Sequence, residues 1–156
     1  MHFIDPTTDR WQPLAESEGP RPHALLSLEQ WNALRDRWPS EAPVGVGLPN
    51  TADVEELAAD VARWDLVVLH FPKWTDGRAY SQARLLRARL RFGSEVRASG
   101  DVVTDMLPLL HRSGFDAAHL RADQDRVSAQ RALHFFERGH YQGDALQSRP
   151  LFARSA

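Results

Sequence analysis

The sequence predicts an α/β fold whose parallel sheet is built from about five strand–helix units. Short apolar runs begin near residues 24, 44, 65, 95 and 115, and each is followed by a segment with helical spacing of apolar residues. The run at 65–71 is almost continuously apolar, as expected for a strand covered on both faces. Such alternation favours right-handed crossovers, which place parallel strands in one sheet wrapped by helices.

The expected elements follow one another along the chain with short connections. Strands are predicted at 24–26, 44–48, 65–71, 95–99 and 115–120, and helices at 28–38, 53–63, 79–92, 101–113 and 125–138. Ser27 is the predicted N-cap of the first helix, because a hydroxyl there can accept a bond from a free helical N–H. Gly114 is a stop signal for the fourth helix, and Pro108 should kink that helix or delay its start.

Two architectures fit this pattern, an open doubly wound sheet and a partial β/α barrel. A complete barrel needs about 250 residues, so a barrel here would be partial or completed by a second copy. In the strand at 95–99, Glu95, Arg97 and Ser99 alternate with two small apolar residues. A polar strand face suits a barrel interior, and it suits the edge strand of an open sheet equally well.

The two ends of the chain are expected to lie outside the main domain. Apolar residues at 3–4 and 11–14 flank a turn-rich segment, which predicts a short N-terminal β-hairpin. The predicted organisation is a hairpin and linker at 1–22, a single α/β domain at 23–139 and a flexible tail at 140–156.

Composition excludes several classes of function. The net charge is −2, from 19 basic and 21 acidic residues, so no overall field attracts nucleic acid or a membrane. The chain of 156 residues contains no cysteine, which removes disulfides, thiol redox chemistry and thiolate metal sites. No apolar run reaches the ~18 residues needed to span a bilayer, and no secretory signal is apparent. A cytoplasmic location is the expectation.

The most informative stretch is the connection after the strand at 65–71 and the helix that follows it. A glycine-containing loop that leads into a helix directs backbone N–H groups towards one point, where an anion can bind. Arginine side chains can add forked hydrogen bonds to the same anion. The candidate anion-binding residues are Lys73, Gly77, Arg78, Ser81 and Arg84. The alternative is that these arginines only solvate a helix face, as charge runs on helices usually do.

Catalytic candidates are few. Asp76 and Asp101 follow strands at the edge where ligands bind in parallel α/β folds, so either could act as a general acid or base. Aspartate at a helix start more commonly caps the helix. His70 and His119 end strands and are expected to be core histidines, and no histidine pair has metal-ligand spacing. No metal site is predicted, and no motif identifies a cofactor.

Residues 71–87 resemble the signature of an uncharacterised bacterial family. The quoted residues are Phe71-Pro72-Lys73 and then 76–87, Asp-Gly-Arg-Ala-Tyr-Ser-Gln-Ala-Arg-Leu-Leu-Arg. The similarity continues through Gly93, Glu95, Arg97, Gly100 and Asp101 to Gly114, Phe115 and Asp116, and so covers about residues 24–120. Members are commonly labelled as oxidoreductases involved in sulfite reduction, because their genes lie beside those of assimilatory sulfite reductase.

The resemblance implies a role in sulfur assimilation, and two hypotheses follow. The first is a non-catalytic accessory protein that binds an oxyanion or a partner, such as sulfite reductase, through residues 76–87. The second is an enzyme, an oxidoreductase by label, that acts on a small anionic substrate at the carboxyl ends of the strands. A third interpretation is a scaffold whose arginines join helices, with a homodimer covering the open edges of a partial barrel.

Overall fold

The computed structural model describes residues 1–134 and residue 145. Seven parallel strands form one sheet in the order β1-β7-β6-β5-β4-β3-β2. The strands are β1 (His2–Phe3), β2 (Gln12–Pro13), β3 (Ala24–Ser27), β4 (Val44–Leu48), β5 (Leu66–Phe71), β6 (Glu95–Gly100) and β7 (Ala117–Ala118). The helices are α1 (Leu28–Leu34), α2 (Ala58–Val61), α3 (Arg78–Ala88), the 3₁₀ turn η1 (Thr104–Met106), α4 (Leu107–Ser113) and α5 (Arg126–His134).

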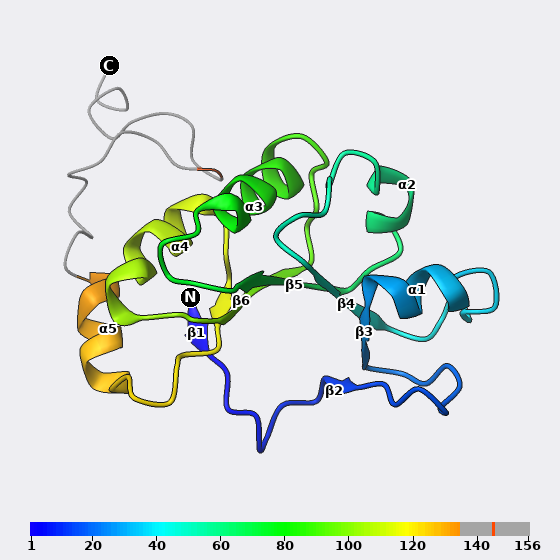
Figure 1. The fold of residues 1–156 in the computed structure, drawn as a ribbon, viewed down its shortest axis with the longest axis horizontal. Helices are drawn as coiled ribbons and strands as arrows, with labels where there is room; N and C mark the ends of the chain where they lie inside the picture. Colours follow the sequence, from blue (N-terminus) through cyan, green and yellow to red (C-terminus); the bar gives the residue numbers. More distant parts are fainter. Residues whose placement is uncertain (135–144, 146–156) are drawn as a thin grey trace.

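The sheet is a curled half-barrel with its helices on the convex side, as Figure 1 shows. Strands β2 to β7 lie in the order of the sequence, each paired in parallel with the next. An open doubly wound sheet would reverse the strand order at some point and place helices on both faces. The predicted parallel α/β fold is therefore confirmed, and of the two architectures the structure adopts the partial barrel.

The hydrophobic core lies between the convex face of the sheet and the helices. Residues that alternate along the central strands point into it, among them Val67, Leu69 and Phe71 of β5, all at most 1% exposed. Trp31 of α1 is fully buried and contacts two further indoles, those of Trp38 and Trp64. The period of two along each strand therefore separates a core face from a concave face.

The predicted N-terminal hairpin is wrong. Strand β1 pairs with β7 at one edge of the sheet, and β2 pairs with β3 at the opposite edge. A turn does form, because Thr8 and Asp9 donate backbone bonds to the carbonyl of Asp5. The chain after this turn crosses the open side of the half-barrel instead of returning along β1, so residues 2–3 and 12–13 are strands of the main sheet.

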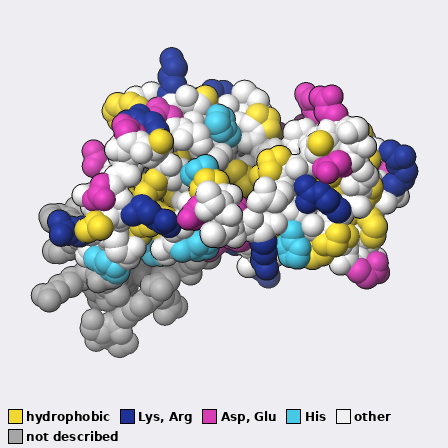
Figure 2. Space-filling model, turned by 90° about the horizontal axis from the view of Figure 1, so that it is seen from below, with side chains coloured by type: hydrophobic (Ala, Val, Ile, Leu, Met, Phe, Trp, Pro, Cys, Tyr) yellow, Lys and Arg dark blue, Asp and Glu magenta, His cyan; other side chains and the backbone are white. Residues whose placement is uncertain are grey.

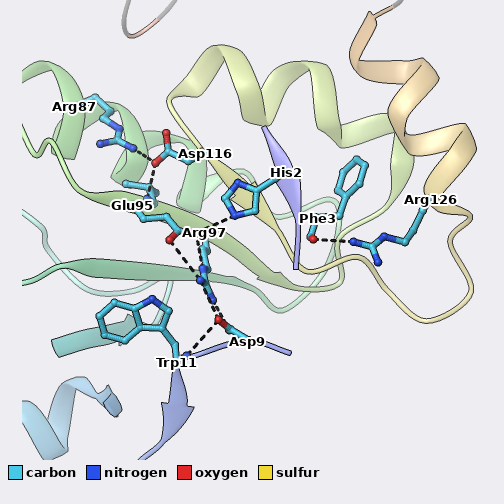
Figure 3. A network of polar contacts seen from close by, with 10 residues as sticks. His2, Phe3, Asp9, Trp11, Arg87, Glu95, Arg97, Asp116 and Arg126 are labelled. Carbon is cyan, nitrogen blue, oxygen red and sulfur yellow. Dashed lines mark hydrogen bonds and ion pairs between the residues drawn. The ribbon is translucent and has the colours of Figure 1, made fainter. Parts of the chain in front are cut away.

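Residues 9–11, which we call the crossing segment, are held on the concave face by packing and by charge. Trp11 is 3% exposed and lies over Gly45, where an added Cβ would come within 3.2 Å of its ring. Asp9 accepts hydrogen bonds from Arg97 of β6, and Glu95 binds the same guanidinium (Figure 3). The first glycine of the Gly45-Val46-Gly47 sequence thus makes room for a tryptophan.

Most predicted elements are present with shorter bounds. The helix expected at 53–63 is reduced to α2, four residues that follow a series of turns. Ser27 caps α1 as predicted, and it shares a capping box with Gln30. Pro108 lies in the first turn of α4, where its missing N–H costs no hydrogen bond, and Gly114 ends that helix in the left-handed conformation. The predicted tail at 140–156 lies outside the described residues except for residue 145.

Candidate functional site

The loops after the central strands meet at the carboxyl edge of the sheet, and two aspartates cross-link them. This is the edge at which parallel α/β folds bind ligands. The loops follow β4, β5, β6 and β7, and they carry Lys73, Asp76 and Asp101, whereas Arg78, Ser81 and Arg84 lie on α3. The structure brings these loops together through hydrogen bonds to Asp76 and Asp101.

Asp76 joins the loop after β4 to the start of α3. Its carboxylate accepts a bond from the Asn50 amide at 2.7 Å and two from the Arg78 guanidinium at 2.7 and 3.0 Å. It also accepts the backbone N–H of Arg78, the first residue of α3, which is the capping role that its position predicted. The bonds from Arg78 lower the pKa of Asp76 to about 2, so this carboxylate is ionised at neutral pH.

Asp101 joins the loops after β5, β6 and β7. It accepts the backbone N–H of Trp74 at 2.9 Å and a bond from the Arg121 guanidinium at 2.7 Å. Its own N–H donates to the carbonyl of Phe71. The bond from Trp74, together with Arg121, lowers the pKa of the Asp101 carboxyl. Asp101 therefore links loops and does not cap the helix that follows it, contrary to the capping interpretation.

The five candidate anion-binding residues do not all face one point. Arg78 is 58% exposed, but its guanidinium is paired with Asp76. Arg84 lies six residues further along α3, which turns it by about 120° from Arg78. Within the described part of the chain Lys73 and Arg84 are exposed and have no ion pair. Gly77 is the N-cap residue of α3, and Ser81 is exposed on its second turn.

A second polar group lies on the concave face at the ends of β5, β6 and β7. Strand alternation and register place His70, Ser99 and His119 side by side in one layer. Nδ1 of His70 is 3.4 Å from the Ser99 hydroxyl oxygen. Both histidines are exposed, so their assignment to the core was wrong. Figure 2 shows several histidine side chains on this face of the molecule.

Gly100 lies directly against His70 and the Phe71 carbonyl. Its φ of +90° is in the region that favours glycine, and an added Cβ would lie 2.7 Å from Cε1 of His70. The imidazole ring therefore occupies the space that any side chain at position 100 would need. The sequence carried a signal for this layer, because the alternating polar residues at 95, 97 and 99 mark a strand face that is not core.

The floor of the concave face is a buried charge network towards the amino ends of the strands. Arg97 is 8% exposed and binds Asp9 and Glu95, while His2 on β1 lies 3.4 Å from Glu95 (Figure 3). The crossing segment therefore lies over the concave face at this end.

The described residues contain neither a metal-binding cluster nor a helix that could span a membrane. In residues 1–134 and at residue 145, no group of three or more His, Cys, Asp or Glu side chains could hold a metal ion. None of the helices in this part of the chain is long and apolar enough to cross a bilayer.

Comparison with known proteins places most of the chain in one family. Residues 45–152 match the family described as bacterial protein of unknown function, DUF934. A comparison with curated proteins gives no match.

Proposed function

The chain belongs to the bacterial family DUF934, and we propose that this protein is an accessory of assimilatory sulfite reduction that binds a small oxyanion or a partner enzyme through residues 76–87. The pathway comes from the resemblance of residues 71–87 to proteins encoded beside sulfite reductase. The mode of action comes from the geometry of the carboxyl edge.

One observation carries the proposal: hydrogen bonds from neighbouring loops hold the connection between β5 and α3, and an unpaired lysine lies on it. Near the end of the connection between β5 and α3, Asp76 accepts a bond from the Asn50 amide. In the middle of the connection, the backbone N–H of Trp74 donates to Asp101. Lys73 lies on this connection, exposed and without a partner among the described residues. A loop ordered before binding loses little entropy when a ligand or partner arrives, and this favours affinity.

An exposed tryptophan supports a partner protein as the occupant. Trp74 is 57% exposed, although its backbone N–H is bound to Asp101. A large aromatic ring held on a fixed backbone beside an unpaired lysine is typical of an interface anchor. The oxyanion and the partner remain alternatives, and different measurements test them.

Thermal unfolding in sulfite, sulfate, phosphate and adenylylated sulfate at matched ionic strength tests the oxyanion. A ligand at a hundred times its dissociation constant adds ~2.7 kcal/mol to stability, which gives a visible rise in Tm. We expect a rise for one of these anions that Lys73→Ala and Arg84→Ala reduce. Arg37→Ala is the matched control, because Arg37 is exposed in the connection after α1.

Sedimentation with sulfite reductase tests the partner. Co-sedimentation that Trp74→Ala abolishes is expected if the loop is the interface. If no anion raises Tm and sulfite reductase does not associate, the accessory role is wrong.

A second candidate function is an enzyme acting on a small anionic substrate at the carboxyl ends of the strands. It is favoured by the hydrogen-bonded pair of His70 and Ser99, since imidazole and hydroxyl are groups that transfer protons. Asp76 and Asp101 are occupied by arginines and are poorer candidates. The measurement is turnover of a small anionic substrate. Turnover by the natural protein that is lost in His70→Ala and retained in Asp101→Asn would favour the enzyme over the accessory protein.

A further inference from the structure

The concave face carries a row of hydrogen-bond donors at the carboxyl ends of three adjacent strands. His70 of β5 pairs in register with Ser99 of β6. The backbone N–H of His119 donates to the Ala98 carbonyl, which continues the ladder between β6 and β7 by one residue and places His119 beside Ser99. Ala98 and Ala118 belong to the core, so alternation along the strands turns Ser99 and His119 to the concave side. We call His70, Ser99 and His119 the histidine row.

The side chains of the histidine row are not tied up by the fold. Nδ1 of His70 and Oγ of Ser99 are 3.4 Å apart, which is longer than the roughly 2.8 Å of a strong hydroxyl hydrogen bond. Within the described part of the chain the His119 ring has no hydrogen-bond partner. Both imidazole rings are exposed. Each ring and the hydroxyl can therefore donate to a ligand without breaking a strong contact within the protein.

The sheet beside the histidine row has free space on the same face. Gly47 of β4 pairs with Val68, two residues before His70 on β5. An added Cβ at Gly47 would find a single described atom within 4 Å, the backbone oxygen of Leu26. Gly45, two residues earlier, is by contrast covered by the crossing segment, whose tryptophan ring would lie 3.2 Å from an added Cβ. The crossing segment thus fills the face at Gly45, and no described side chain does so at Gly47.

The charges around the histidine row favour an anion as its ligand. Asp9 and Glu95, the acids of this face towards the amino ends of the strands, are paired with Arg97. Asp101, at the carboxyl end of β6, is paired with Arg121. Among the described residues, a cation would therefore find no unpaired carboxylate beside the row. The oxygens of an anion, by contrast, accept hydrogen bonds from hydroxyl and imidazole donors.

We infer that the histidine row binds a small tetrahedral oxyanion, such as phosphate or sulfate, whose oxygens accept hydrogen bonds from His70, Ser99 and His119. Neighbouring strands lie about 4.8 Å apart, and the curl of the sheet brings side chains on its concave face closer together than the strands. Donors in such a row reach different oxygens of one ion. The site uses none of residues 76–87. It rests on the second candidate function for the pair of His70 and Ser99, but it requires binding and not turnover.

Sodium phosphate and sodium sulfate are the probes, and sodium chloride at the same pH and ionic strength is the reference. Histidine ring ¹⁵N resonances are followed during the titration, and His70→Ala and His119→Ala identify the two rings by loss of their signals. His111, exposed on α4, is the internal control. We expect phosphate or sulfate to shift the His70 and His119 signals saturably, with one dissociation constant, and to leave His111 unmoved. Phenyl phosphate that binds as tightly as phosphate would identify an ester as the ligand, and weaker binding would identify the free ion.

Ser99→Ala and His119→Ala are the decisive variants, because each removes one donor without adding volume. Loss of one hydrogen bond to an ion should weaken binding about tenfold. The control variant His111→Ala should bind as the natural protein does. The inference is overturned if the His70 and His119 signals do not shift saturably, if His111 shifts with them, or if either decisive variant keeps full affinity.

The same titration separates this site from the one proposed at residues 76–87. Lys73→Ala and Arg84→Ala should leave binding at the histidine row unchanged. If these two variants weaken binding and the variants of the histidine row do not, the ion lies at the loop and helix after β5. The inference is then wrong and the proposed accessory function stands. Binding at the row without turnover of any anionic substrate would contradict the enzyme and leave the inference in place.

Discussion

At the residue scale, two aspartates that the sequence marks as helix caps serve mainly as links between loops. Asp76 and Asp101 each combine an arginine with a donor from another loop, Asn50 for the first and the N–H of Trp74 for the second. The donors lie 26 and 27 residues from their aspartates in the chain. Local spacing could predict the cap of α3 at Asp76, but not these distant partners.

The ionisation of Asp76 should report on this link. Its pKa is lowered to about 2 in the folded protein, mainly by Arg78, whereas an aspartate in an unfolded chain has a pKa of about 3.9. A lowered folded pKa contributes stability that is fully present above pH ~4 and is lost as pH falls towards 2. Carboxyl ¹³C NMR across pH 1.5–6 should follow this titration. In Arg78→Ala the midpoint should rise, and an unchanged midpoint would mean that Arg78 is not the cause.

At the element scale, α3 shows how one helix separates arginines of different roles. Arg84, Arg87 and Arg91 are three and four residues apart, so in an unbroken helix they would share one flank. Arg87 has a structural role, since its side chain is 4% exposed and donates to the carbonyls of Gly114, Phe92 and Ser94. Arg91 lies beyond the helix, which ends at Ala88, so the flank predicted from an unbroken helix does not exist there.

Replacing Arg87 should therefore destabilise the protein far more than replacing Arg84. Arg87→Met keeps an aliphatic chain but removes the donor of three carbonyls, while Asp116 keeps only the bond from the Val96 N–H. We expect a loss of about 1–3 kcal/mol or more, as when buried acceptors are left without a donor. Arg84→Met is the control on the same helix, and it should stay within about 0.5 kcal/mol of the natural protein. Urea unfolding measures both, and equal effects would contradict the anchoring role.

At the scale of the whole molecule, the N-terminal chain holds the two edges of the half-barrel together. Strand β1 completes one edge, β2 completes the other, and the crossing segment between them covers the concave face. Arg126 of α5 also donates to the carbonyl of Phe3, which ties β1 to the last described helix. The expected homodimer remains a prediction, but the edges it was meant to cover are occupied by residues 2–3 and 12–13.

The crossing segment should be essential for stability. Trp11→Ala removes a side chain that is 3% exposed, and loss of a buried tryptophan costs about 3–5 kcal/mol. Trp74→Ala, at a position 57% exposed, should change stability by less than about 0.5 kcal/mol. Thermal and urea unfolding of both variants test this. Similar stability of the two variants would mean that the crossing segment is dispensable, as a linker would be.

The sequence by itself determined the α/β class, the order of the central strands and helices, the cap at Ser27 and the stop at Gly114. These features depend on residues close together in the chain, through the period of two in strands and of 3.6 in helices. Only the tertiary structure decided the half-barrel, the crossing of residues 9–11, the exposure of His70 and the bonds that join Asp76 to Asn50 and Asp101 to Trp74. Each of these depends on how the sheet curls and on which residues far apart in the chain it brings into contact, and the local pattern carries no record of that.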